Sequence, residues 1–110
     1  MDLYVRYLKD YYNKNVITFS DVALLVTVDV SPTEVYWEDI YVTPEARESK
    51  VALRLCNKAL KIAQDQGKTT IIGSADPKSK MFKRSMKLME LYGFEITGTS
   101  NGLIILKKGI

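Results

Sequence analysis

Charged side chains of both signs meet within a short stretch in the middle of the chain. Glu38 and Asp39 lie inside a β-branched, aromatic segment, and a loop containing Pro44–Arg47 leads from it into a long segment of helical periodicity. A helix N-terminus presents unpaired backbone N–H groups and the positive end of the helix dipole, which together can hold a phosphate. Arg47 and Lys50 add positive charge there. The stretch therefore predicts an anion site, although most helix N-termini bind nothing.

The residue types that are missing exclude several kinds of chemistry. The chain has no histidine, which rules out Ser-His-Asp catalysis, histidine-ligated metals and a histidine pH switch. Its single cysteine, Cys56, can form neither an internal disulfide nor a cysteine zinc cluster. No base is visible near Cys56, so we expect a buried thiol rather than a nucleophile. We predict no metal site.

The cellular location of the protein is predicted from the sequence patterns for membrane spans and signal peptides. No apolar run approaches the roughly 20 residues of a membrane span. Residues 1–4 carry no basic stretch followed by an apolar one, as a signal peptide would. We therefore expect a protein of the reducing cytoplasm with no membrane partner.

The charge is distributed unevenly along the chain. Residues 1–50 carry 5 basic and 9 acidic side chains, whereas residues 51–110 carry 11 basic and 4 acidic ones. Four of the basic residues share about 100° of arc on one predicted helix: Lys80, Lys83, Arg84 and Lys87. This face is either simply solvated or contacts an anionic partner. Because the aromatic residues of that helix fall on its buried side, base stacking is not supported and nucleic acid is the weakest candidate.

Hydrophobic periodicity predicts a single domain of mixed secondary structure over the 110 residues. Helices are expected over residues 2–13, 49–66 and 78–92, and strands over residues 16–19, 22–30, 35–42, 69–73, 94–97 and 103–106. Thr43 or Ser49 could cap the second helix, and Asn101-Gly102 indicates a terminal hairpin. This order predicts an α/β or α+β fold with a partly parallel sheet.

Four tyrosines crowd the first predicted helix, at positions 4, 7, 11 and 12. Two explanations are open: the rings pack that helix against the core, or they form an exposed aromatic surface for a partner.

The segment Glu38–Arg47, with the helix after it, resembles the central segment of the GNAT superfamily, the acetyl-CoA-dependent N-acetyltransferases. The later strand over 69–73 and the helix that ends in Gly93-Phe94 resemble that family's closing elements. The resemblance covers about residues 35–106. It implies a GNAT-like mixed central sheet flanked by helices, truncated at the N-terminus, where one helix stands in place of two.

The resemblance also implies a site. The pyrophosphate of acetyl-CoA is expected on the loop formed by Arg47, Ser49, Lys50, Val51 and Ala52. The strand carrying Ile40 and Val42 is expected to offer backbone groups to the pantetheine arm and the acetyl carbonyl. In polyamine-type members a glutamate in the position of Glu38 helps to remove the proton from the attacking amine. The alternative for Glu38 is a solvated or salt-bridged strand residue.

The chain departs from the family pattern at Lys50, Met89 and Phe82. Lys50 stands where the loop has a glycine, so its side chain either obstructs the phosphates or binds them. Glu48 in the same loop would repel a pyrophosphate. Met89 and Phe82 replace the family's general-acid tyrosine and an asparagine.

Three functions follow in order of preference. The first is an N-acetyltransferase that moves an acetyl group from acetyl-CoA to an amine acceptor by direct attack. The second is a non-catalytic module acting through protein partners or self-association, comparable to reduced GNAT-like proteins of small phages. The third, resting on charge alone, is a nucleic-acid-binding domain.

Overall fold

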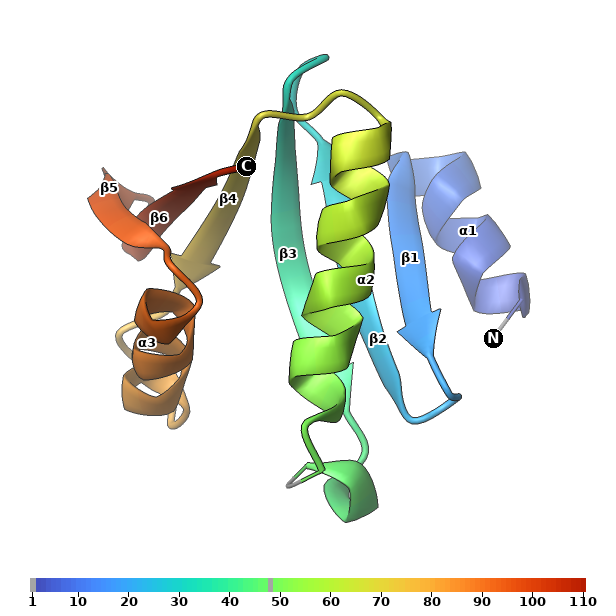
Figure 1. Ribbon diagram of the computed structural model, residues 1–110, viewed down its shortest axis with the longest axis horizontal. Coiled ribbons are helices and arrows are strands. Elements are labelled where there is room, and N and C mark those ends of the chain that lie inside the picture. The colour runs from blue at the N-terminus through green and yellow to red at the C-terminus, as the bar shows by residue number, and fades with distance from the viewer. Residues whose placement is uncertain (1, 48) are drawn as a thin grey trace.

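The computed structural model describes residues 2–47 and 49–110, apart from the side chain of Asp2. Its elements follow the predicted order, with one short 3-10 helix added (Figure 1). They are α1 (Asp2–Tyr12), β1 (Lys14–Phe19), β2 (Ala23–Asp29), β3 (Glu34–Val42), η1 (Pro44–Ala46), α2 (Val51–Asp65), β4 (Thr70–Ala75), α3 (Phe82–Leu91), β5 (Glu95–Ser100) and β6 (Leu103–Gly109).

The six strands form one mixed sheet in the order β1-β2-β3-β4-β6-β5, which confirms the predicted fold class. Among the described strands, β3 and β4 alone pair in parallel, and over a short stretch: residues 34–36 pair with residues 70–72. Beyond this register the two strands diverge, and a gap opens between the two halves of the sheet backbone (Figure 1). The β5–β6 hairpin turns at Asn101 and Gly102, both with positive φ, as the Asn-Gly pair predicts.

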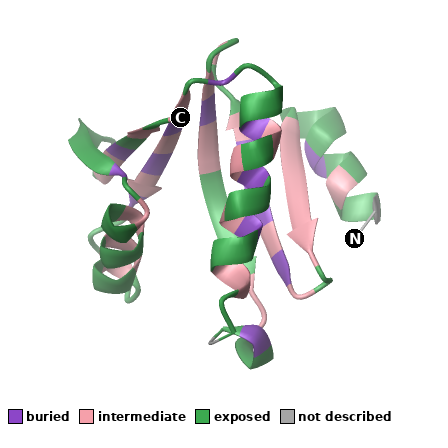
Figure 2. Cartoon of the chain, viewed as in Figure 1, coloured by how far each residue is buried: buried purple, intermediate pink, exposed green. Residues whose placement is uncertain are grey.

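Helices cover both faces of the sheet. On β2, Leu25 is buried in a cluster with Leu55 of α2, while the neighbouring Val26 shares a surface hollow with Leu8 of α1. Because successive side chains of a strand point to opposite faces, α1 and α2 lie on opposite sides. Most residues of β2 are buried, which fits a strand covered on both faces. The buried stripe of α2 faces the sheet, whereas α3 has no fully buried residue (Figure 2).

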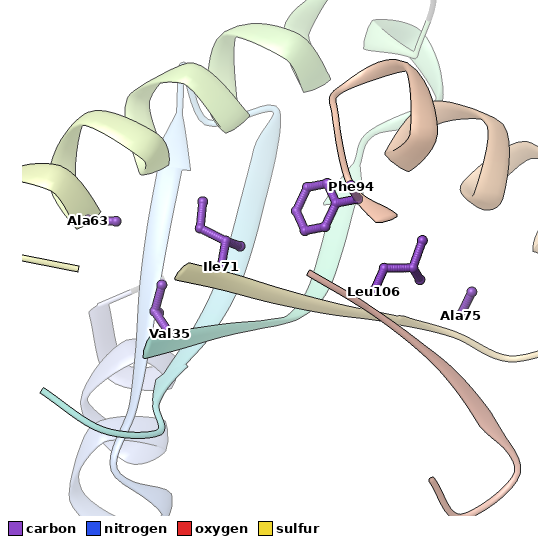
Figure 3. Packing of buried hydrophobic residues seen from close by; sticks show 6 residues of the cluster. All are labelled: Val35, Ala63, Ile71, Ala75, Phe94 and Leu106. Atoms are coloured by element: carbon purple, nitrogen blue, oxygen red, sulfur yellow. The ribbon is translucent and has the colours of Figure 1, made fainter. Parts of the chain in front are cut away.

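Two apolar clusters fill the space between the sheet and the helices α2 and α3. The smaller one lies under the first half of α2. The larger one joins the end of α2 to the β4–β6 half of the sheet, where Phe94 lies between Ile71 and Leu106 (Figure 3). Trp37 packs against both clusters and so contacts both halves of the sheet.

The beginnings of two helices differ from prediction. α2 starts at Val51, and neither proposed residue caps it. The Ser49 hydroxyl donates instead to the Ala46 carbonyl at 2.6 Å, and the buried Thr43 hydroxyl has no partner among the described residues. α3 starts at Phe82 rather than 78, because the Asp76 carboxylate accepts from a nearby backbone N–H and stabilises a turn instead.

The first helix exposes its tyrosines. Tyr4, Tyr7, Tyr11 and Tyr12 are between 43% and 73% exposed, whereas Leu8 is buried. The expectation that the rings pack against the core is therefore wrong, and the exposed aromatic surface is what the chain builds. Among the helices of the described residues, none is long and apolar enough to cross a membrane.

Candidate functional site

The candidate site lies on β3, where that strand leaves β4. Opposite Val26 and Thr27 of β2 the register slips, so that Asp39 pairs with Val26 and Trp37 pairs with Thr27. Glu38 is the extra residue of the resulting β-bulge. A bulge bends the strand and re-aims the side chain at that point. Glu38 lies on the face of the sheet that carries α1, opposite Trp37, and the bulge lets the next residue, Asp39, line the same hollow.

The Glu38 carboxylate is held by the ammonium of Lys14. The Lys14 Nζ donates to Glu38 Oε1 at 2.9 Å and lies 2.7 Å from Oε2. The two side chains are about one-third exposed or less, and Lys14 also lies over the ring of Tyr12 at 5.6 Å. The pair sits in a hollow of about 330 Å³ between α1 and the sheet. The hollow is lined by Tyr4, Leu8, Lys14, Val26, Glu38 and Asp39.

The backbone of β3 beyond Tyr36 has strand pairing on one side only. Ile40 and Val42 pair with residues of β2, and the register with β4 has already ended. The Ile40 side chain is 44% exposed, and Val42 packs against the smaller apolar cluster. The edge of β3 that faces the gap therefore has backbone groups available to an extended ligand.

The loop before α2 contains a residue in the left-handed backbone conformation that glycine favours. Lys50 occupies the N-cap position with φ of 61°, in the left-handed region that glycine adopts without strain. Its side chain makes no capping hydrogen bond and is exposed. The half-buried Val51 and Ala52 follow as the first residues of α2. A lysine here thus keeps the shape of the loop and adds a positive charge at the helix N-terminus.

Two other residues of this loop already have partners. Arg47 donates from Nε to the Val42 carbonyl at 3.1 Å and stacks over the Tyr41 ring at 5.9 Å. The Ser49 hydroxyl is occupied by its bond to Ala46. Arg47 therefore lies against the end of β3, and its guanidinium has further N–H donors besides the one that bonds Val42. Glu48, which was expected to repel a pyrophosphate, lies outside the described residues.

Three aromatic rings connect the two halves of the sheet on the α2 side. The rings of Trp37, Tyr92 and Phe94 lie 6.1–6.4 Å apart, centre to centre. The Tyr92 hydroxyl donates to Asn57 Oδ1 of α2 at 2.8 Å, which ties the end of α3 to α2. Burial raises the pKa of Tyr92, with a smaller contribution from Cys56. Desolvation also raises the pKa of the half-buried Cys56 thiol to about 11, so it is a weak nucleophile at neutral pH.

The apolar side chains of the last helix, α3, are more exposed to solvent than its sequence predicts. Met89 packs beside Gly73 of β4, where its sulfur lies 3.5 Å from the position a Cβ would take. Met81 and Leu88 are about half exposed, because α3 makes little contact with the sheet. A hollow of about 510 Å³ runs along this helix beside Lys83 and Lys87, away from the candidate site.

No metal centre is visible in the described part of the chain, which contains no group of three or more His, Cys, Asp or Glu side chains placed to hold an ion.

The mixed sheet that opens between two parallel strands beside a helix N-terminus defines the class of protein. The chain belongs to the acetyltransferase (GNAT) family, whose sequence profile matches residues 5–94. No curated protein matches the chain by sequence.

Solved structures share the fold. The chain is similar to the PaiA N-acetyltransferase of Thermoplasma acidophilum in complex with coenzyme A, with a TM-score of 0.73 and 17% identity over 84% of this chain and 57% of that one. It is also similar to Ard1 of Thermoplasma volcanium, with a TM-score of 0.76 and 16% identity over 100% of this chain and 80% of that one.

A third similar structure is a GNAT acetyltransferase of Elizabethkingia anophelis with acetyl-CoA bound, at a TM-score of 0.76 and 15% identity over 96% and 83% of the two chains. At these identities the likeness concerns the fold. The chain spans little more than half the length of the PaiA structure.

Several residues of the site had no local signal in the sequence. Lys14 is 24 positions from Glu38, and nothing in a short β segment indicates a partner across two strands. Asn57 lies on the helical surface beside ordinary polar residues. Trp37 is the exception: its place next to Glu38, in a strand of alternating faces, could have indicated a ring on the α2 side.

Proposed function

We propose that the chain is an acetyl-CoA-dependent N-acetyltransferase whose cofactor lies along the gap between β3 and β4. The observation that carries the proposal is the coincidence of three features at this gap: the unpaired edge of β3, the start of α2 and the bulged Glu38. Family membership and the CoA-bound structures of the same fold support it.

The loop fits the phosphates of CoA in charge and in shape. The positive φ of Lys50 gives the close turn, while Arg47 and Lys50 supply positive charge beside the first backbone N–H groups of α2. Ser49, Val51 and Ala52 would contribute backbone, and the edge at Ile40 and Val42 would hold the pantetheine arm. A cytoplasmic location stays a prediction from the sequence.

The reaction needs an amine that has lost its proton next to an activated carbonyl. When bound, acetyl-CoA supplies a thioester whose carbonyl carbon is open to attack. Glu38 would accept the proton of the incoming amine, as a carboxylate within hydrogen-bond reach can. Since Lys14 occupies both oxygens of Glu38, an acceptor ammonium must displace the Lys14 ammonium or share the carboxylate with it.

Calorimetric titration with acetyl-CoA tests the proposal. We expect saturable binding that Lys50→Glu weakens about tenfold or more, because a carboxylate replaces an ammonium beside the phosphates. Lys61→Glu, on the exposed surface of α2, serves as the matched control for charge reversal. Glu38→Gln should retain binding and lose acetyl transfer to a panel of amines by about 100-fold. Absence of binding at millimolar acetyl-CoA would refute the proposal.

A non-catalytic binding module is the second candidate. One observation favours it: charged groups of the site already have partners within the chain, Glu38 with Lys14 and Arg47 with the Val42 carbonyl. The exposed tyrosines of α1 offer a surface for a protein partner. Binding of acetyl-CoA without transfer to any amine, unchanged by Glu38→Gln, would favour this candidate.

A further inference from the structure

The amine nearest to the candidate base belongs to the chain itself. β1 directly follows α1 (Figure 1), and Lys14 is its first residue. The Lys14 side chain reaches Glu38 on β3, beyond the intervening strand β2. Both carboxylate oxygens lie within 2.9 Å of Lys14 Nζ. The Lys14 side chain is 27% exposed, so its head is open to the hollow between α1 and the sheet.

We propose that Lys14 is an acetyl acceptor within its own chain. The inference rests on the proposed function, with an acetyl thioester as donor and Glu38 as base. Lys14 Nζ, after giving its proton to the Glu38 carboxylate, forms the new C–N bond to the acetyl carbon. The C–S bond of the thioester breaks with its electron pair going to sulfur, and the thiolate takes up the proton from Glu38. The nitrogen loses its second proton to solvent as the amide forms. The products are acetyl-Lys14, the free thiol and one released proton, with no oxidation or reduction.

The position of Lys14 favours this reaction over transfer to other lysines. An amine held next to its base reacts without the entropy loss of bringing two molecules together. The Lys14 stem is flexible, and four methylene groups let the head leave the carboxylate without moving β1. Lys61 provides the comparison, since it also forms an ion pair, with Asp65 at 2.8 Å, but on the exposed face of α2 away from the gap.

The modification would change the state of the site. Acetylation removes the positive charge of Lys14 and with it the ion pair to Glu38. The carboxylate then becomes free for an external amine. Lys14 is in this sense the first substrate and also an inhibitor of the site. Its acetylation ends the inhibition, because the ion pair with Glu38 is lost.

The reaction should accelerate with pH. The hydrogen bond to Glu38 is the largest cause that raises the pKa of Lys14. Burial is the second-largest effect and opposes it, while the charges of Glu38, Tyr12 and Tyr4 add smaller increases. Asp39 lines the same hollow from β3. Because the ammonium form is favoured at neutral pH, the reactive neutral amine becomes more abundant as the pH approaches the Lys14 pKa.

Peptide mass spectrometry of the full chain tests the inference. The protein is incubated in parallel with acetyl-CoA and with a truncated donor that lacks the phosphates, the acetyl thioester of N-acetylcysteamine. We expect Lys14 to be acetylated about 100-fold faster than Lys61, at a rate per chain that does not depend on protein concentration. Glu38→Gln should remove this advantage and leave Lys61 unchanged. Lys14→Arg, which keeps a cation beside Glu38 but has no reactive amine, should abolish the modification.

The outcomes separate this inference from the proposed function. Acetylation of Lys14 no faster than that of Lys61, or equally fast in Glu38→Gln, would overturn the inference even if calorimetry shows CoA binding and external amines are acetylated. Glu38-dependent labelling of Lys14 by the truncated donor, without CoA binding, would support the reactivity of Lys14 and overturn CoA as the donor. If neither donor labels Lys14 and CoA does not bind, both proposals fall.

Discussion

At the scale of single residues, neighbours determine what a chemically capable side chain does. Glu38 has the type and place of a base, but the bulge and Lys14 decide where its carboxylate points and what it binds. Cys56 shows the same dependence. It is half-buried next to Tyr92, and desolvation raises its pKa to about 11.

The raised pKa of Cys56 predicts a loss of stability at alkaline pH. The unfolded thiol ionises from about pH 9, whereas the folded thiol keeps its proton to about pH 11. The stabilisation is therefore complete below pH 9 and is lost as the pH rises to about 11, by about 2 kcal/mol. Urea unfolding of the reduced protein at pH 8 and pH 11 measures it. Cys56→Ala should show a correspondingly smaller fall, and equal falls in both proteins would contradict the prediction.

At the scale of elements, the loop before α2 places a lysine, Lys50, in a backbone conformation that glycine adopts without strain. The left-handed conformation of Lys50 brings the chain from η1 into the helix, and it costs a non-glycine residue about 1–2 kcal/mol. Glycine would avoid this energetic penalty but would carry no charge. Under the proposed function, the Lys50 ammonium offsets the penalty by binding a phosphate.

Lys50→Gly separates the shape of the loop from its charge. We expect the free energy of unfolding to change by less than about 1 kcal/mol, because relief of strain and added freedom of the unfolded chain oppose each other. Lys50→Val should destabilise by more, since a β-branched residue resists positive φ. Both are measured by urea unfolding. In calorimetry, weaker acetyl-CoA binding by Lys50→Gly would assign the side chain to the phosphates; tighter binding would show that it obstructs them.

At the scale of the whole molecule, two half-sheets are joined by a short backbone pairing and by side-chain contacts across it, among them the Lys107–Glu34 ion pair. They share a three-residue parallel register, a hydrogen bond between the hydroxyls of Tyr36 and Ser74, and the packing of Trp37 against both apolar clusters. The two strands diverge beyond this junction, while each half-sheet stays paired internally.

Trp37→Ala should weaken the junction more than any exposed change on the same strand. We expect a loss of roughly 3 kcal/mol, because the ring leaves a space at the boundary of both clusters. The β4–β6 half should then lose hydrogen-exchange protection before the β1–β2 half. Tyr41→Ala, on β3 with its ring 48% exposed, is the control and should cost much less. Uniform loss of protection across the sheet would mean that the halves do not separate.

Local patterns in the sequence are sufficient to predict the order of the helices and strands and to indicate the family. Alternation and helical periodicity are short-range properties, so they predict the strands, the helices and the mixed sheet, and the Asn101-Gly102 turn follows from backbone preference alone. The helix starts at Val51 and Phe82 were missed because the hydrogen bonds of Ser49 and Asp76 compete with helical ones, and residue type does not decide that competition.

Contacts between distant parts of the chain were decided only by the tertiary structure. The Lys14–Glu38 pair, the bond from Tyr92 to Asn57 and the exposure of the α1 tyrosines each depend on how elements far apart in sequence are placed in space. The type of a side chain indicates what chemistry it can do. Its partner and its solvent exposure, which determine whether it does so, are set by packing energies summed over the whole fold.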